Sequence, residues 1–130
     1  MSRKILIIED DLDMLTLLGI VLHGAGFDTL QARSAAGGLE LARKTRPDLV
    51  LLDIMMPEID GWEACHRLRQ IGDMPIIFVT ALRDAANESR GLLVGDDYIM
   101  KPFDHHDLVQ RVCGHIDRSL AKQAGLAKAT

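Results

Sequence analysis

Short apolar runs alternate regularly with longer segments of helical periodicity along this chain of 130 residues. Short runs of this kind are typical of strands, and they lie at Lys4–Ile8, Phe27–Gln31, Leu49–Leu52, Ile76–Val79 and Tyr98–Met100. Several are apolar throughout, as expected of strands covered on both faces. The alternation predicts an α/β fold, a doubly wound (βα)₅ unit around a parallel sheet of five strands.

The segments between these runs carry apolar residues at helical spacing, most clearly between Met14 and Leu22. Asp11 or Asp13 is expected to cap the first helix, and Ser34 the second. In a sheet of this type, ligands bind at the carboxyl ends of the strands, where the strand order reverses. The residues that follow each strand are therefore the first candidates for function.

Composition and charge exclude several classes of protein. Hydrophobic residues make up 48% of the chain and charged residues 26%, a normal balance for one globular domain. A net charge of -4 supplies no basic field, so neither nucleic acid nor membrane is expected as a direct partner. The apolar runs are too short for a membrane span or a secretory signal. Two cysteines, Cys65 and Cys113, form no disulfide framework and favour a cytoplasmic setting.

Polar side chains stand directly after four of the predicted strands. They comprise an acidic triplet, a further aspartate, a threonine and a lysine: Glu9, Asp10, Asp11, Asp53, Thr80 and Lys101. Each alone has an ordinary explanation, such as a helix cap or a solvated surface residue. Because parallel strands end at one edge of a sheet, all four positions are expected to converge on one pocket.

The chemistry of these side chains indicates phosphoryl transfer. Neighbouring carboxylates repel one another by several kcal/mol at an effective dielectric constant of about 20, so a cation must offset them. Their oxygen atoms suit Mg²⁺, which can neutralise an incoming phosphoryl group. Asp53 would be the nucleophile that becomes an aspartyl phosphate. Lys101 can pair with one phosphoryl oxygen, and the hydroxyl of Thr80 can donate to another.

Four motifs together resemble the response-regulator receiver domain of two-component signalling. They read ILIIEDD at 5–11, DIMMPEIDG at 53–61, VTA at 79–81 and DDYIMKPF at 96–103. The resemblance covers residues 3 to 120 and implies the flavodoxin-like, CheY-like strand order 2-1-3-4-5. It divides the chain into a receiver domain at 1–120 and a tail or start of a linker at 121–130.

The resemblance also implies a role for each residue of the predicted pocket. Asp10 would bind Mg²⁺ directly and Glu9 through a water molecule, while the backbone carbonyl of Met55 would be a further ligand. Asp53 would bind the metal and accept the phosphoryl group. Thr80, Tyr98 and Lys101 would complete the site, the first two as the switch pair and the last as the phosphoryl-binding lysine, with a cis bond to Pro102.

The implied function is signalling rather than enzymatic turnover of a substrate. A sensor histidine kinase or a phosphotransfer protein would be the donor, and the domain would catalyse its own phosphorylation and slow dephosphorylation. The face formed by the fourth helix, the fifth strand and the fifth helix would then control an output domain or partner protein. A free-standing receiver, a transcription factor and a hybrid kinase all fit this pattern.

The chain departs from the family pattern in three places. Val94-Gly95-Asp96-Asp97 lacks the alanine that usually follows the glycine, so the loop before the fifth strand is one residue short. Met55 and Leu82, two residues after Asp53 and Thr80, are apolar and cannot orient a hydrolytic water. On the fourth helix, Asp84, Glu88 and Leu93 stand where the transcription-factor branch usually carries Lys, Arg and Glu, so its symmetric dimer is not expected.

Three other functions fit the sequence less well. A haloacid-dehalogenase-type phosphatase would use Asp11 and Asp13, but that family places its lysine before the closing acidic motif, and Asp53 would have no role. A flavin- or nucleotide-binding module needs a phosphate loop, and the first loop here is acidic. A pseudo-receiver interaction module should lack a phosphorylation residue, and none is missing.

Overall fold

The computed structural model describes the backbone of residues 2–129 and the side chains of residues 2–125. Within this range the chain forms five strands: β1 Lys4–Ile8, β2 Asp28–Ala32, β3 Leu49–Leu52, β4 Ile76–Thr80 and β5 Asp97–Met100. Five helices alternate with them: α1 Leu12–Gly24, α2 Ala35–Thr45, α3 Gly61–Ile71, α4 Ala85–Val94 and α5 His105–Ala129. The predicted (βα)₅ alternation is confirmed.

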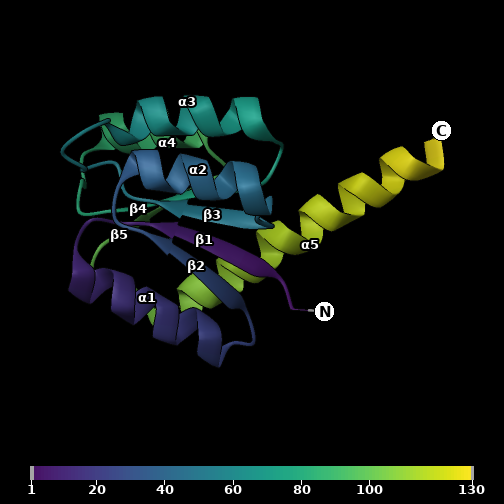
Figure 1. Ribbon diagram of the computed structural model, residues 1–130, viewed down its shortest axis with the longest axis horizontal. Coiled ribbons are helices and arrows are strands. Elements are labelled where there is room, and N and C mark those ends of the chain that lie inside the picture. The colour runs from purple at the N-terminus through teal and green to yellow at the C-terminus, as the bar shows by residue number, and fades with distance from the viewer. Residues whose placement is uncertain (1, 130) are drawn as a thin grey trace.

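The strands form one parallel sheet in the order β2-β1-β3-β4-β5, so the predicted strand order is also confirmed. In the register of this sheet, Leu6 of β1 pairs with Leu30 of β2 and with Val50 of β3. Figure 1 shows the helices in two layers, with α1 and α5 on one face of the sheet and α2, α3 and α4 on the other. The strand order reverses between β1 and β3, which places a crevice at their carboxyl ends.

Strands β1, β3, β4 and β5 each contribute to two hydrophobic cores, because successive side chains point to opposite faces of the sheet. In β1, Leu6 and Ile8 pack with α2 and α3, whereas Ile5 and Ile7 pack with α1 and α5. All four side chains are at most 1% exposed. This two-sided burial explains why the central strands have no polar alternation.

Strand β2 begins one residue later than the sequence pattern predicts. The amide of Phe27 donates to the carbonyl of Leu22 at 3.1 Å, so Phe27 belongs to the turn that closes α1. The strand therefore begins at Asp28. Strands β4 and β5 are each one residue longer than predicted, because Thr80 and Asp97 join the ladder between them.

The N-terminal caps of α1 and α2 are side chains that the sequence predicted. Of the two candidates for α1, Asp11 is the cap, and its Oδ1 accepts from the amide of Asp13 at 3.0 Å. The hydroxyl of Ser34 caps α2 by accepting from the amide of Gly37 at 3.1 Å. Since α1 is capped three residues after β1 ends, the loop that carries the first acidic residues is short.

Helix α5 packs on the sheet in its first half and is exposed from residue 121 to residue 125. Leu108, Val112 and Ile116 pack against the sheet. Residues 121–125 are exposed, and Figure 1 shows this end of the helix projecting from the body of the domain. No helix within residues 2–129 is both long enough and apolar enough to span a membrane.

The helical backbone continues through the segment that the sequence assigned to a tail. Backbone from 121 to 129 is α-helical, while Thr130, the last residue of the segment predicted as a tail, lies outside the described residues. The division into a receiver domain at 1–120 and a tail or linker at 121–130 stays a prediction.

Candidate functional site

Three carboxylates gather at the carboxyl edge of the sheet. Glu9 and Asp10 follow β1, and Asp53 follows β3, the neighbouring strand. A carboxylate oxygen from each lies within 4.8 Å of the other two. Glu9 and Asp53 are buried and Asp10 is half-buried, whereas Asp11 is used as the cap of α1. We call this cluster, together with the side chains that contact it, the acidic pocket.

Lys101 enters the acidic pocket from the end of β5. Its Nζ lies 3.2 Å from Oδ2 of Asp53 and also contacts Oε1 of Glu9. The backbone fixes this position, because the amide of Lys101 donates to the carbonyl of Thr80 at 2.8 Å. The peptide bond to Pro102 is cis, as the resemblance implied. One ammonium group thus joins carboxylates from two strands and offsets part of their repulsion.

Burial and crowding change the protonation of this pocket. Burial, together with the neighbouring carboxylate of Asp53, raises the pKa of Glu9 from its ordinary value of 4.5 to about 7, against the opposing effect of Lys101. For Lys101, burial lowers the pKa, but the two carboxylates outweigh it and the pKa is raised. Lys101 therefore stays positively charged, while the Glu9 carboxyl resists ionisation chiefly because it is buried and also because it lies beside the Asp53 carboxylate.

The donor atoms of the acidic pocket fit a hard divalent cation. Carboxylate oxygens on one edge, with a half-buried Asp10 open to solvent, match the preference of Mg²⁺ for oxygen ligands and retained waters. The side chain of Met55 is 55% exposed, and its amide donates to Oδ1 of Asp53 at 3.0 Å. This hydrogen bond orients the Asp53 carboxylate and brings the backbone of Met55 next to it.

Thr80 and Tyr98, the predicted switch pair, both contact Leu82. Oγ1 of Thr80 is an acceptor for the amide of Leu82 at 3.3 Å. The hydroxyl of Tyr98 donates to the carbonyl of Leu82 at 2.8 Å, and the ring is only 4% exposed. In this structure the ring of Tyr98 therefore points into the protein.

A glycine makes room for the inward tyrosine. Among the ten residues of α4, all of which the structure describes, Gly91 alone is buried. A Cβ atom at this position would collide with the ring of Tyr98 and would lie 3.3 Å from Phe78. Helix α4 can therefore lie directly on the Tyr98 ring, which couples the position of this helix to the ring.

Two residues near the pocket were not among the predicted site residues. Gly61 begins α3, and a Cβ atom there would lie 2.9 Å from the carbonyl oxygen of Asp53, so only glycine allows this close approach. Arg33 places Nη2 3.4 Å from the carbonyl of Asp10. Since Arg33 directly follows β2, its position at the same sheet edge could have been inferred from the strand pattern.

One carboxylate connects the short loop before β5 to the neighbouring elements. Only Gly95 and Asp96 separate α4 from β5. Oδ2 of Asp96 accepts from the amide of Ile76 at 2.8 Å and pairs with Nη2 of Arg69 at 2.6 Å. The missing residue is thus accommodated by a direct connection from the loop to the start of β4 and to α3.

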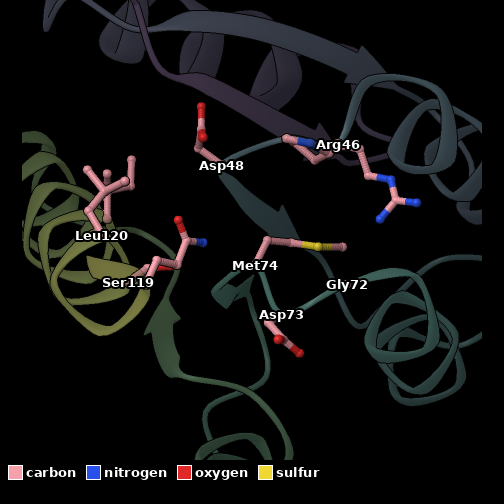
Figure 2. A pocket seen from close by; sticks show the side chains of 10 residues that line it. Arg46, Asp48, Gly72, Asp73, Met74, Ser119 and Leu120 are labelled. Carbon is pink, nitrogen blue, oxygen red and sulfur yellow. The ribbon is translucent and has the colours of Figure 1, made fainter. Parts of the chain in front are cut away.

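Other hollows of the surface are separate from the acidic pocket. A cavity of about 360 Å³ has Asp48, Met74 and Leu120 in its lining. Figure 2 shows these side chains around it. It lies where β3 and β4 begin, so it is at the opposite edge of the sheet from Asp53. A groove between α3 and α4 contains Trp62, which packs on Phe78 with ring centroids 5.1 Å apart.

The family model described as the response regulator receiver domain matches residues 5–113. The chain is 42% identical over 120 residues to the DNA-binding response regulator MtrA of Mycolicibacterium paratuberculosis, covering 92% of this chain and 53% of that protein. It is 41% identical over 119 residues to the transcriptional regulatory protein YrkP of Bacillus subtilis, covering 91% and 51%. The chain spans about half the length of these curated relatives.

Solved structures agree with the fold. A CheY-like receiver domain from Methanospirillum hungatei superposes with a TM-score of 0.88 at 28% identity, covering 94% of this chain and 99% of that one. The BeF3-activated receiver domain of Klebsiella pneumoniae RstA gives a TM-score of 0.84 at 33% identity, covering 88% and 98%. None of these comparisons supports a phosphatase or a pseudo-receiver.

Proposed function

This chain belongs to the response regulator receiver domain family, and we propose that Asp53 is the residue in it that accepts the phosphoryl group. The observation that carries this assignment is the contact of Lys101 with Asp53, 3.2 Å from Nζ to Oδ2, beside two further carboxylates at the sheet edge. The ammonium group that already faces this buried carboxylate can also pair with a negatively charged oxygen of the incoming phosphoryl group.

In the proposed reaction a carboxylate oxygen of Asp53 attacks phosphorus. A new P–O bond forms, the bond to the donor breaks, and the donor keeps its electron pair, which leaves an acyl phosphate on Asp53. The ammonium group of Lys101 then pairs with one oxygen of the transferred phosphoryl group, and the Thr80 hydroxyl donates a hydrogen bond to another. Mg²⁺, held by Asp10, Asp53 and the carbonyl of Met55, with Glu9 acting through water, would neutralise the phosphoryl oxygens.

The partners of this domain follow from its family. Receiver domains of response regulators interact with histidine kinases, so a sensor kinase or a phosphotransfer protein would supply the phosphoryl group, in the cytoplasm. The output partner would be controlled through the face of α4, β5 and α5. DNA binding belongs to the full-length relatives by name, and we assign no direct nucleic-acid contact to this domain, whose net charge is -4.

Intact-mass spectrometry after treatment with acetyl phosphate and Mg²⁺ tests the assignment. The wild type should gain one phosphoryl group, and Asp53→Asn should gain none. Asp11→Asn is the matched control, because Asp11 is a neighbouring acid that caps α1 and should leave phosphorylation intact. An equal adduct on the wild type and Asp53→Asn would refute the role of Asp53.

A further inference from the structure

Arg33 lies at the mouth of the acidic pocket. It directly follows β2, and the amide of Glu9 donates to the carbonyl of Ala32 at 3.0 Å, which extends the pairing of β1 and β2 to the residue before Arg33. This pairing holds Arg33 beside the loop that carries Asp10. Nη2 of Arg33 donates to the backbone carbonyl of Asp10 at 3.4 Å, so the guanidinium contacts this loop although the side chain is exposed.

Most of the binding capacity of this guanidinium is not used within the chain. A guanidinium has five N–H donors and keeps its charge at every ordinary pH. The acceptor that Arg33 contacts is a neutral carbonyl, and Arg33 forms no ion pair with any residue whose side chain is described. Its remaining donors can therefore bind two oxygens of a phosphate group side by side.

A phosphoryl donor carries negative charge and has to approach this pocket past other negative charges. Asp10 is half-buried at the opening, and Asp11 and Asp13 are exposed next to it. Lys101 lies deeper, because its side chain is only 15% exposed and its Nζ already contacts two carboxylates. Arg33 is thus a positive charge that a donor can meet before it reaches Lys101.

We propose that Arg33 binds the phosphoryl donor at the mouth of the acidic pocket, and that it thereby favours donors with a dianionic phosphate group, such as acyl phosphates. The inference rests on the proposed function, since the bound donor then passes its phosphoryl group to Asp53. The transfer step is unchanged: an oxygen of Asp53 attacks phosphorus, and the leaving carboxylate keeps the electron pair. Because Arg33 acts before this step, it raises the affinity for the donor rather than the rate of bond breaking.

The rate of phosphorylation at increasing donor concentration tests this role. With acetyl phosphate, a dianion at neutral pH, Arg33→Gln should raise the apparent KM about fivefold, as expected for the loss of one exposed charge pair. The rate at saturating donor should stay within about twofold of the wild type. With phosphoramidate, a monoanion at neutral pH, the apparent KM should rise less, and added salt should reduce both effects. An unchanged KM for acetyl phosphate, or an equal rise for both donors, would overturn the proposal.

Two variants serve as controls for the charge and for its position. Arg33→Lys keeps the charge and should recover most of the affinity for acetyl phosphate. Arg46 is also an exposed arginine that contacts a backbone carbonyl, with Nη1 3.1 Å from the oxygen of Ile71. It lies just before β3, at the opposite edge of the sheet, so Arg46→Gln changes the net charge equally and should leave the KM unchanged. An equal rise of the KM in Arg33→Gln and Arg46→Gln would contradict a local role.

The affinity for Mg²⁺ distinguishes donor binding from support of the loop. Loss of a nearby positive charge should leave the affinity for Mg²⁺ equal or slightly higher. If Arg33 only held the Asp10 loop in place, Arg33→Gln would lower this affinity instead. A clear loss of Mg²⁺ affinity in calorimetry would therefore assign Arg33 to loop support and overturn its role in donor binding.

A donor analogue that cannot transfer its phosphoryl group separates this inference from the proposed function. Acetonylphosphonate has a carbon atom in place of the bridging oxygen of acetyl phosphate, and it is a dianion at mildly alkaline pH. In NMR titrations, Arg33→Gln should weaken its binding about fivefold. Equal affinities would overturn the role of Arg33 even if Asp53 is phosphorylated. Weakened binding to Arg33→Gln, combined with a wild type that gains no phosphoryl group in mass spectrometry, would sink the proposed function and leave the assignment of Arg33 standing.

Discussion

The hydroxyl of Tyr98 donates to the backbone carbonyl of Leu82 at 2.8 Å, which ties β5 to the loop between β4 and α4. The ring beneath this hydroxyl packs on Phe78, with centroids 6.3 Å apart. The amide of Leu82 in turn donates to the hydroxyl oxygen of Thr80. A single residue of the loop therefore connects both members of the predicted switch pair.

Tyr98→Phe tests what this hydrogen bond contributes. The substitution keeps the ring against Phe78 and removes only the donor, so the free energy of unfolding should fall by about 1 kcal/mol. Urea unfolding with an unchanged m-value measures the loss. Tyr98→Leu is the comparison variant, and it should cost more because the aromatic packing is lost too. Equal stability of wild type and Tyr98→Phe would show that the bond contributes nothing net.

The raised pKa of Glu9, about 7, predicts a pH dependence of stability in the metal-free protein. Below its ordinary pKa of 4.5, Glu9 is protonated in both the folded and the unfolded chain and contributes no difference. Between pH 4.5 and about 7, the unfolded chain releases this proton first, so folding loses stability as the pH rises. The full effect is up to about 3 kcal/mol, at about 1.4 kcal/mol per pKa unit.

Glu9→Gln isolates this contribution, because glutamine is neutral throughout the range. In EDTA, the unfolding free energy of the wild type should fall relative to that of Glu9→Gln from pH 4.5 to 7. Chemical denaturation at several pH values gives both curves. Two parallel curves would mean that Glu9 ionises as easily in the folded protein as in the unfolded one.

The acidic residues of the pocket should contribute unequally to the affinity for Mg²⁺. Asp10 is expected to bind Mg²⁺ directly and Glu9 through water, so Asp10→Asn should lower the affinity by roughly tenfold or more, and Glu9→Gln by less. Calorimetric titration with Mg²⁺ gives both affinities. Asp11→Asn should leave the affinity nearly unchanged, since Asp11 caps α1. Undiminished binding by Asp10→Asn would remove Asp10 from the ligand set.

Much of the fold was predictable from the sequence because local signals and topology agree. Continuous apolar runs such as Leu49–Leu52 and the caps Asp11 and Ser34 can be identified by local rules. The misplaced start of β2 is different, because Phe27 is apolar like a strand residue and yet its amide closes α1. Only the hydrogen-bond partner separates these assignments, and the sequence does not contain it.

The acidic pocket was predictable for a similar reason. Glu9, Asp53 and Lys101 each follow a strand, and a parallel sheet brings strand ends together whatever the loops do. The close approach of Gly61 to Asp53 was not predictable, because it depends on how α3 packs on the loop after β3. The inward ring of Tyr98 likewise depends on helix packing rather than on strand pattern.

The lifetime of the proposed acyl phosphate should depend on two apolar side chains. Met55 is 55% exposed and Leu82 is half-buried, and neither can hold a hydrolytic water. Met55→Asn combined with Leu82→Glu should therefore speed dephosphorylation several-fold. Decay of the phosphorylated mass peak measures the rate. Met55→Leu with Leu82→Met keeps both positions apolar and should leave the rate unchanged, so a slower or equal rate in the polar variant would count against the idea.

The last prediction concerns self-association on activation. The charged side chains that a symmetric dimer through α4, β5 and α5 would use are already paired within this chain. Both Asp97 and Asp107 contact Arg111, and Oδ2 of Asp97 also lies 2.9 Å from Nε2 of His115. To form intermolecular pairs, the chain would have to break these contacts, and α4 would offer Asp84 and Glu88 where basic groups are needed. Beryllofluoride with Mg²⁺ should therefore produce no tight dimer of this kind in light scattering.

Arg67→Glu, which breaks the i,i+4 pair with Glu63 on α3, is the control for the loss of a helical ion pair. A magnesium-dependent dimer that Arg111→Glu abolishes and Arg67→Glu does not would show that the internal pairs open on activation and that the acidic residues of α4 do not prevent pairing.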